Sequence, residues 1–163
     1  MEMQRITHIR NFVFGVEDSL VSTVGLLSGI AVAGTVEHTI VLAGIVLISV
    51  EAFSMGAGSL LSEHSAQEIA LQREVPIFDS LKSALIMFLS YFFAGFIPLA
   101  PYVLLPAKAA FWISIGASLA ALLVLGTISG RTAGIRPLRP ALEMFLIGGA
   151  AIALGTSVGI IFA

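Results

Sequence analysis

The stretch FGVEDSLVSTVGLLSGIAVAG, residues 14–34, decides the fold class of this chain. It is long and apolar enough to cross a bilayer, because a helix needs about 20 apolar residues to span a hydrocarbon core of roughly 30 Å. Glu17 and Asp18 nevertheless lie side by side within it. Carboxylates are costly in such a segment and mark functional sites in membrane proteins. The stretch therefore predicts a membrane helix that carries a site.

The composition of the whole chain agrees with a membrane protein. Of its 163 residues, 58% are hydrophobic and only 11% are charged, whereas soluble proteins carry about 25% charged residues. A net charge of −2 without a basic patch gives no sign of a nucleic-acid partner. The chain has no cysteine, which excludes disulfides and thiolate metal ligands. No nucleophile with a base is recognisable, so we expect neither an enzyme nor a resident cofactor.

We predict an all-α membrane protein with a single transmembrane domain over residues 1–163 and five spans, at about 12–34, 39–61, 80–98, 109–129 and 141–162. The third span is expected to end in the proline cluster that begins at Pro98, because helices do not propagate through proline. Small residues spaced by four, Gly25 with Gly29 and Gly155 with Gly159, permit close helix contacts. The spacing is compatible with packing within one chain or between two chains.

The basic residues predict the orientation of the spans. If the N-terminus is cytoplasmic, only Lys108 of the eight lysines and arginines falls outside, as the excess of positive charge in cytoplasmic loops requires. We therefore expect a cytoplasmic N-terminus and an external C-terminus. The predicted location is the plasma membrane of a prokaryote or a vacuolar-type membrane of a eukaryote.

Three side chains able to bind a metal are predicted to gather in the cytoplasmic half of the membrane. At a rise of about 1.5 Å per residue, Asp18 lies roughly 9 Å and Glu51 roughly 15 Å from the cytoplasmic ends of their spans. Met55 follows Glu51 by one turn on the same helix face. No basic residue lies in any span at this depth, so the carboxylates are either protonated or bound to a cation. Ser22 and Ser54 are candidates for secondary oxygen ligands.

The types of ligand narrow the class of cation. Carboxylate oxygens suit hard or borderline cations, whereas a thioether sulfur favours transition metals over magnesium or calcium. An aspartate, a glutamate and a methionine together therefore indicate Fe²⁺ or Mn²⁺ more than Ca²⁺. A transporter that couples such a cation to protons would use the ionised and the protonated state of the carboxylates in turn.

Further acidic residues lie outside this depth. After the second span come Glu63, His64 and Glu68, and a helix that continued past the membrane would place His64 and Glu68 four residues apart, a spacing able to share a metal. They are candidates for a site where cations gather, or else for an ordinary solvated helix end. Glu17 points to another side of its helix and is interpreted as reaching toward the interface. Glu143 is interpreted as a solvated carboxylate in a first helical turn.

Two of these segments resemble the vacuolar iron transporter family. EDSLVSTVGLLSGIA (17–31) is similar to the family's first-helix Asp-small-Leu-Val-Ser/Thr-Thr run, and EAFSMGAGSLLSE (51–63) is similar to its second-helix Ser-Met-Gly/Ala-x-Gly run. The resemblance implies a five-helix protomer that forms a homodimer, with the metal path at the interface. It also implies export of Fe²⁺, and often Mn²⁺, from the cytosol in exchange for protons. By motif position the ligands fall on Asp18 and Met55, with Glu51 as the candidate for the family's second-helix glutamate.

The chain departs from many members of that family. About 18 residues join the second and third spans, too few for the glutamate-rich cytoplasmic metal-binding domain that these members insert there. One protomer also offers too few ligands for a six-coordinate ion, and a two-fold axis would double each of them. The first helix, with Gly25 and Gly29 beside Asp18, is the expected interface between the two copies.

The sequence thus predicts a homodimeric exporter of Fe²⁺ or Mn²⁺ by proton antiport, whose partners are membrane lipid, a second copy of the chain, divalent metal ions and protons. Two other hypotheses stay open at this point. The chain could be a non-transporting assembly subunit whose buried acids pair with basic residues of another protein. It could also be a proton-coupled carrier of an organic solute.

Overall fold

The computed structural model describes residues 2–163, which form helices and contain no strand. Five segments of this range are long and apolar enough to cross a membrane, which confirms the predicted all-α protein with five spans. The helices are α1 (Glu2–Val32), α2 (Glu37–Leu71), α3 (Phe78–Ala94), α4 (Phe96–Leu104), α5 (Ala107–Thr132) and α6 (Leu138–Ile161). Together, α3 and α4 make up one span, Ser80–Leu104.

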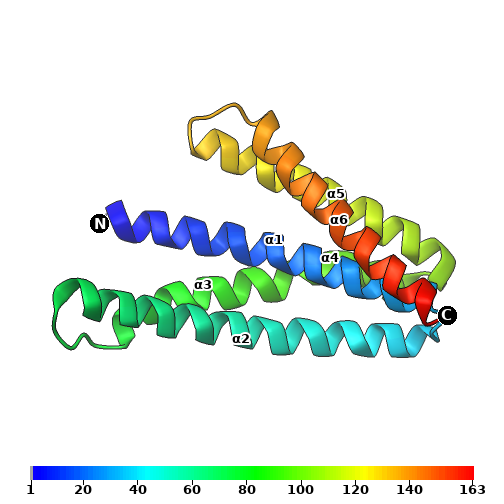
Figure 1. Cartoon of the computed structure of the whole chain (residues 1–163), viewed down its shortest axis with the longest axis horizontal. Coiled ribbons are helices and arrows are strands. Elements are labelled where there is room, and N and C mark those ends of the chain that lie inside the picture. The colour runs from blue at the N-terminus through cyan, green and yellow to red at the C-terminus, as the bar shows by residue number, and fades with distance from the viewer. Residues whose placement is uncertain (1) are drawn as a thin grey trace.

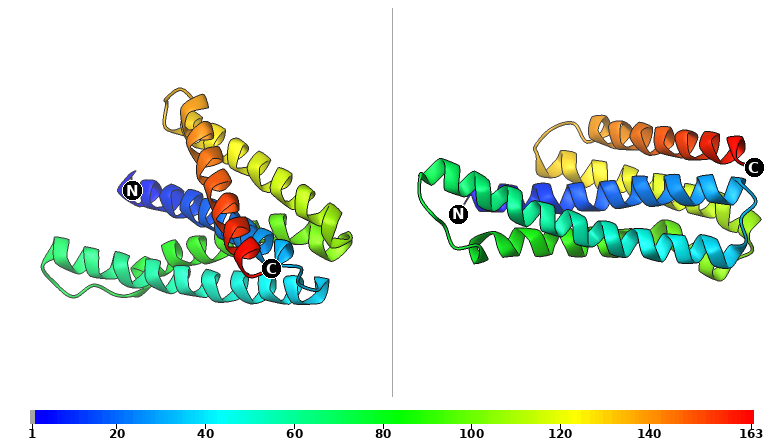
Figure 2. Two further views of the ribbon diagram at one scale, coloured as in Figure 1. Left: turned by 45° about the vertical axis from the view of Figure 1, so that its right-hand side comes forward. Right: turned by 60° about the horizontal axis from the view of Figure 1, so that its bottom comes forward.

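Helix α1 lies at the centre of the molecule (Figure 1). The pair α2 and α3 lies along one side of it, and the pair α5 and α6 lies along the other. The two pairs spread apart toward the end that holds the N-terminus, as a second view also shows (Figure 2). The C-terminus lies at the opposite end, as an odd number of spans requires.

The surface and the interior have the polarity expected in lipid rather than in water. Large apolar side chains such as Phe53, Leu146 and Leu154 are about two-thirds exposed or more. The interior, by contrast, contains many small hydroxyl side chains, among them Ser19, Thr23, Ser28, Ser83, Ser114 and Ser118. Small and hydroxyl-bearing residues are typical of contacts between membrane helices, where apolar side chains gain nothing by leaving lipid.

Glycines bring α1 and α6 into direct backbone contact. A Cβ atom on Gly29 would lie 2.6 Å from the carbonyl oxygen of Gly155, and a Cβ on Gly155 would overlap the carbonyl oxygen of Gly25. Gly159 meets Gly29 in the same way. The two glycine pairs noted in the sequence therefore pack against each other within one chain. This corrects the expectation that the Gly25 and Gly29 stripe forms the interface between copies, because α6 already covers it.

The third span is broken at Gly95 and extends further than the sequence predicts. Pro98 lies in the first turn of α4, where a missing N–H is tolerated, so the helix runs on to Leu104. A Cβ atom on Gly95 would lie 2.6 Å from the Cγ1 atom of Ile48 and 2.9 Å from the Oγ atom of Ser19. The glycine therefore lets α1 and α2 approach the break closely.

Helix α2 is longer than a bilayer is thick. Its 35 residues correspond to about 52 Å, against roughly 30 Å for the hydrocarbon core. The extra length projects at the end of the molecule that holds the N-terminus (Figure 1). Residues 72–77 then lead directly into α3, so the predicted short connection between these spans is present.

The α1–α6 contact predicts a position-specific effect of a larger side chain. Gly155→Val should force α1 and α6 apart, and overpacking of this kind costs about 1–3 kcal/mol. We expect the detergent-purified variant to melt several degrees lower than the wild-type protein in a thermal-shift measurement. Gly149→Val is the matched control on the same helix, because a Cβ atom at Gly149 meets nothing within 4 Å. Equal melting temperatures for the two variants would contradict this packing.

Candidate metal site

The structure brings together the two acids that the sequence places at similar depth. The carboxyl groups of Asp18 on α1 and Glu51 on α2 are close enough for their charges to interact. Both side chains are partly buried. Two like charges repel each other more where water is partly excluded. A cation between them, or a proton on one of them, would relieve this repulsion.

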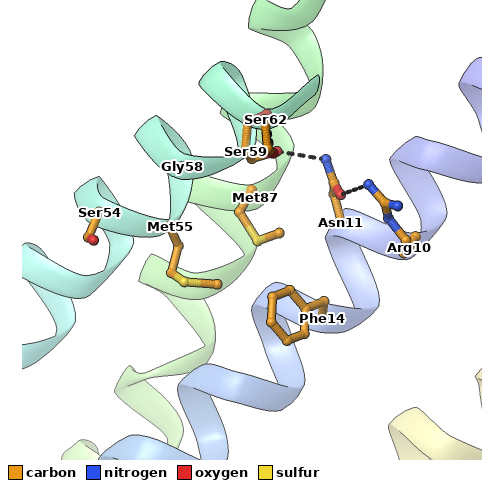
Figure 3. Close-up of a pocket in the computed structure, with 9 residues that line it drawn as sticks. All are labelled: Arg10, Asn11, Phe14, Ser54, Met55, Gly58, Ser59, Ser62 and Met87. Atoms are coloured by element: carbon orange, nitrogen blue, oxygen red, sulfur yellow. Dashed lines mark hydrogen bonds between the residues drawn. The ribbon is translucent and has the colours of Figure 1, made fainter. Parts of the chain in front are cut away.

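A cavity of about 610 Å³ lies between α1, α2 and α3 (Figure 3), and neither Asp18 nor Glu51 is among the residues that line it. Met55 lies one helical turn from Glu51, and Phe14 lies one turn from Asp18, so the lining of the cavity comes within one helical turn of each acid. Met55 of α2 and Met87 of α3 both reach into it. The remaining lining residues are Arg10, Asn11, Phe14, Ser54, Gly58, Ser59 and Ser62.

Asn11 connects three helices at the wall of this cavity. Its side chain is only 2% exposed. Its Nδ2 atom donates hydrogen bonds to the Oγ atom of Ser59 on α2, at 2.9 Å, and to the backbone oxygen of Ser83 on α3, at 3.4 Å. Its Oδ1 atom accepts a bond from Arg10 at 3.5 Å. These contacts fix the positions of α1, α2 and α3 around the cavity.

Tyr91 of α3 is fully buried and contacts the turn of α1 that follows Asp18. Its hydroxyl shares a hydrogen bond of 2.7 Å with the Oγ atom of Ser22. Its backbone oxygen accepts a bond of 2.6 Å from the Oγ atom of Ser19. The hydroxyl is also within electrostatic range of Asp18 and Glu51. The predicted secondary residue Ser22 is thus tied to the third span.

Sequence reasoning missed Asn11, Met87 and Tyr91. Asn11 belongs to the first span as the structure shows it but lies just outside the predicted one, which begins at residue 12. Nothing in the sequence around Met87 distinguishes it from a methionine that packs in a hydrophobic core. A signal for Tyr91 does exist, because Ser90 and Tyr91 interrupt the apolar run of the third span. Polar residues in such a run face the interior of a helix bundle.

The acidic residues after the second span lie on the projecting part of α2. The helix continues past the predicted end of the second span, and the Nε2 atom of His64 lies 3.5 Å from the Oε1 atom of Glu68. The Oε1 atom of Glu63 accepts a bond of 3.4 Å from Gln67. This group lies about 18 Å along the helix from Glu51. Within residues 2–163, no three His, Asp or Glu side chains converge to hold a metal ion.

The two remaining acids of interest differ in their surroundings. The Oε1 atom of Glu143 accepts a hydrogen bond of 2.9 Å from the Nε atom of Arg139, and both side chains are more than half exposed. This agrees with the interpretation of Glu143 as a solvated carboxylate near a helix start. Glu17 is partly buried and lies within electrostatic range of Asp18.

The fold and this site define an integral, multi-pass membrane protein with paired acids between its helices. Comparison with known proteins narrows the class. The model of the VIT family matches residues 9–76 and 67–160. The chain belongs to the VIT family.

Plant proteins named Vacuolar iron transporter 1 are among its relatives. The proteins from Tulipa gesneriana, Oryza sativa subsp. japonica and Arabidopsis thaliana are each 26% identical to the chain. The alignments cover 89% of this chain and 83%, 81% and 82% of the respective relatives. Each extends over 205 residues, more than the 163 of this chain. The relatives therefore carry inserted segments that this chain lacks.

The buried contacts of Asn11 predict a loss of stability when its amide is removed. Asn11→Ala would leave the backbone oxygen of Ser83 without this donor in an apolar region, and an unsatisfied buried group costs about 1–3 kcal/mol. We expect a clearly lower melting temperature in detergent. Ser62→Ala is the control, because its hydroxyl is exposed and bonds only to the backbone oxygen of Ser59 on its own helix. A melting temperature of Asn11→Ala equal to that of Ser62→Ala would contradict the role of Asn11.

Proposed function

We propose that the protein exports a divalent transition metal, Fe²⁺ or Mn²⁺, from the cytosol in exchange for protons. Membership of the VIT family, whose relatives above are named iron transporters, supports a metal transporter. The observation that carries the proposal is that Asp18 and Glu51 lie within electrostatic range of each other in the membrane spans, one helical turn from the residues Phe14 and Met55 that line a cavity. Acids of this kind need a cation or a proton, and an antiporter supplies each in turn.

The proposed cycle uses the two protonation states of the acids. Metal enters from the cytosol through the cavity, passes the thioether of Met55 and binds to the ionised carboxylates of Asp18 and Glu51. Protons that arrive from the far side neutralise the carboxylates, and the metal loses its charged ligands and leaves. Ser22 and Ser54 offer further oxygen atoms at the two ends of this path. Glu63, His64 and Glu68, on the projecting part of α2, would raise the local concentration of cations at the cytosolic mouth.

We further propose that the working unit is a homodimer. Within residues 2–163 of one protomer, the acidic and histidine side chains do not make up a site of three such ligands. Phe14, one turn from Asp18, is 49% exposed, so this part of α1 has surface available for a second copy. A second copy placed on this face would bring a second set of Asp18, Glu51 and Met55 to the ion.

The first test is metal flux into liposomes that contain the purified protein. We expect uptake of Fe²⁺ or Mn²⁺ that depends on a pH gradient, and we expect Asp18→Asn to abolish it, because the amide carries no charge for the cation. Glu17→Gln is the matched control at the neighbouring position and should retain most of the flux. Absence of flux for both metals, from dimeric wild-type protein in sealed liposomes, would favour the assembly-subunit hypothesis instead.

A second test concerns the choice between metals. Met55→Leu keeps the volume of the side chain but removes the sulfur, which prefers Fe²⁺ to Mn²⁺. We expect the ratio of kcat/KM for the two metals to shift toward Mn²⁺ by about 1 kcal/mol, or roughly fivefold. Met144→Leu is the control, because Met144 is buried in a core cluster with residues of α1, α3 and α5 and does not line the cavity. An unchanged ratio in Met55→Leu would contradict a role of the thioether in selection and favour a carrier of another solute.

A further inference from the structure

Tyr91 makes two different contacts with the turn of α1 that carries Asp18. Its backbone oxygen accepts the bond from Ser19, the residue next to Asp18. Its hydroxyl shares the bond with Ser22, one helical turn further along. Because both contacts come from one residue, the orientation of this turn is set from α3. The hydroxyl contact lies on the side where the charges of Asp18 and Glu51 act.

The hydroxyl of Tyr91 is not required to anchor α1 to α3. The bond from Ser19 goes to the backbone and persists in any side-chain variant at this position. Gly15 of α1 also lies against the backbone oxygen of Met87 on α3. We therefore expect α1 and α3 to stay packed together when the Tyr91 hydroxyl is removed. The bond between Tyr91 and Ser22 is not needed for that packing.

Tyr102 provides an internal comparison. It is also buried, at 4% exposure, and packs among apolar residues of α1, α2 and α5. Its hydroxyl has no hydrogen-bond partner within the described residues. Tyr102 therefore serves as a matched control: it is a buried tyrosine whose hydroxyl is not bonded to the turn of α1 that carries Asp18.

We propose that Tyr91 is a positioning residue of the ion site, which holds the hydroxyl of Ser22 so that its oxygen faces the cation beside Asp18 and Glu51. A serine oxygen can take part in one such hydrogen bond and still present a lone pair. Without Tyr91 the Ser22 side chain would rotate freely, and its nearest other acceptor, the backbone oxygen of Ser19, lies at 3.5 Å. Tyr91 would therefore act on metal affinity through Ser22. This inference rests on the proposed function.

The test compares two conservative variants in the liposome assay. Tyr91→Phe and Tyr102→Phe each remove one buried hydroxyl and keep the ring. We expect Tyr91→Phe to raise the KM for Fe²⁺ or Mn²⁺ by about three- to tenfold, the effect of a typical hydrogen bond, with kcat little changed. Tyr102→Phe should keep the wild-type KM. Both variants should purify with melting temperatures close to that of the wild-type protein.

The route through Ser22 is tested by a double-mutant cycle. Ser22→Ala should raise KM as Tyr91→Phe does, and the double variant should be no worse than either single variant. Ser22→Thr keeps the hydroxyl and should retain a KM near that of the wild-type protein. Additive effects of Tyr91→Phe and Ser22→Ala would show that the two residues act separately and would overturn the inference.

The remaining outcomes distinguish the two levels of the proposal. Flux in the wild-type protein with equal KM values for Tyr91→Phe and Tyr102→Phe overturns the role of Tyr91 and leaves the transporter proposal intact. A change in KM that follows a loss of melting temperature in both variants identifies a structural effect and also overturns it. Absence of metal flux in the wild-type protein overturns the proposed function and this inference with it.

Discussion

A carboxylate at membrane depth must be kept away from lipid, and the arrangement of this protein follows from that constraint. Helix α1, which carries Asp18, lies at the centre with a pair of spans on each side (Figure 1). Glu51, the acid on α2, lies within electrostatic range of Asp18. Large apolar side chains such as Phe53 and Leu154 cover the outer surface instead. The interior combines apolar core clusters with buried hydroxyls and glycines, and the acids lie partly buried at its edge.

Helix α1 makes different kinds of contact with α6 and with α3. Toward α6 the contact is made by glycine backbones, with Gly29 against Gly155, and it leaves no polar group to move. Toward α3 the contact is made by hydrogen bonds from Ser19 and Ser22 to Tyr91. Helix α1 is thus held by close backbone packing on one side and by side-chain hydrogen bonds on the other.

The sequence predicts those features that depend on one helix at a time. Hydropathy gives the five spans, and the helical rise places Asp18 and Glu51 at similar depth, because both are properties of a single segment. Contacts between segments cannot be predicted in this way. The same four-residue spacing of Gly25 and Gly29 permits packing within a chain or between chains, and only the structure shows that α6 is the partner. Tyr91 escaped prediction for the same reason, since its importance lies in the two serines of another span.

The point where the third span is divided, at Gly95, lies close to Tyr91 and its contact with α1. Pro98 cannot donate a backbone hydrogen bond to the carbonyl group one turn earlier, and the helix is interrupted at Gly95. There the backbone oxygen of Tyr91 accepts a bond from the N–H group of Gly95 as well as from Ser19. Irregular backbone at membrane depth is tolerated only where protein or a water-filled path surrounds it, and broken helices line the sites of many transporters. The change of helix at Gly95 thus lies one turn from Tyr91, whose backbone oxygen also holds the residue that follows Asp18.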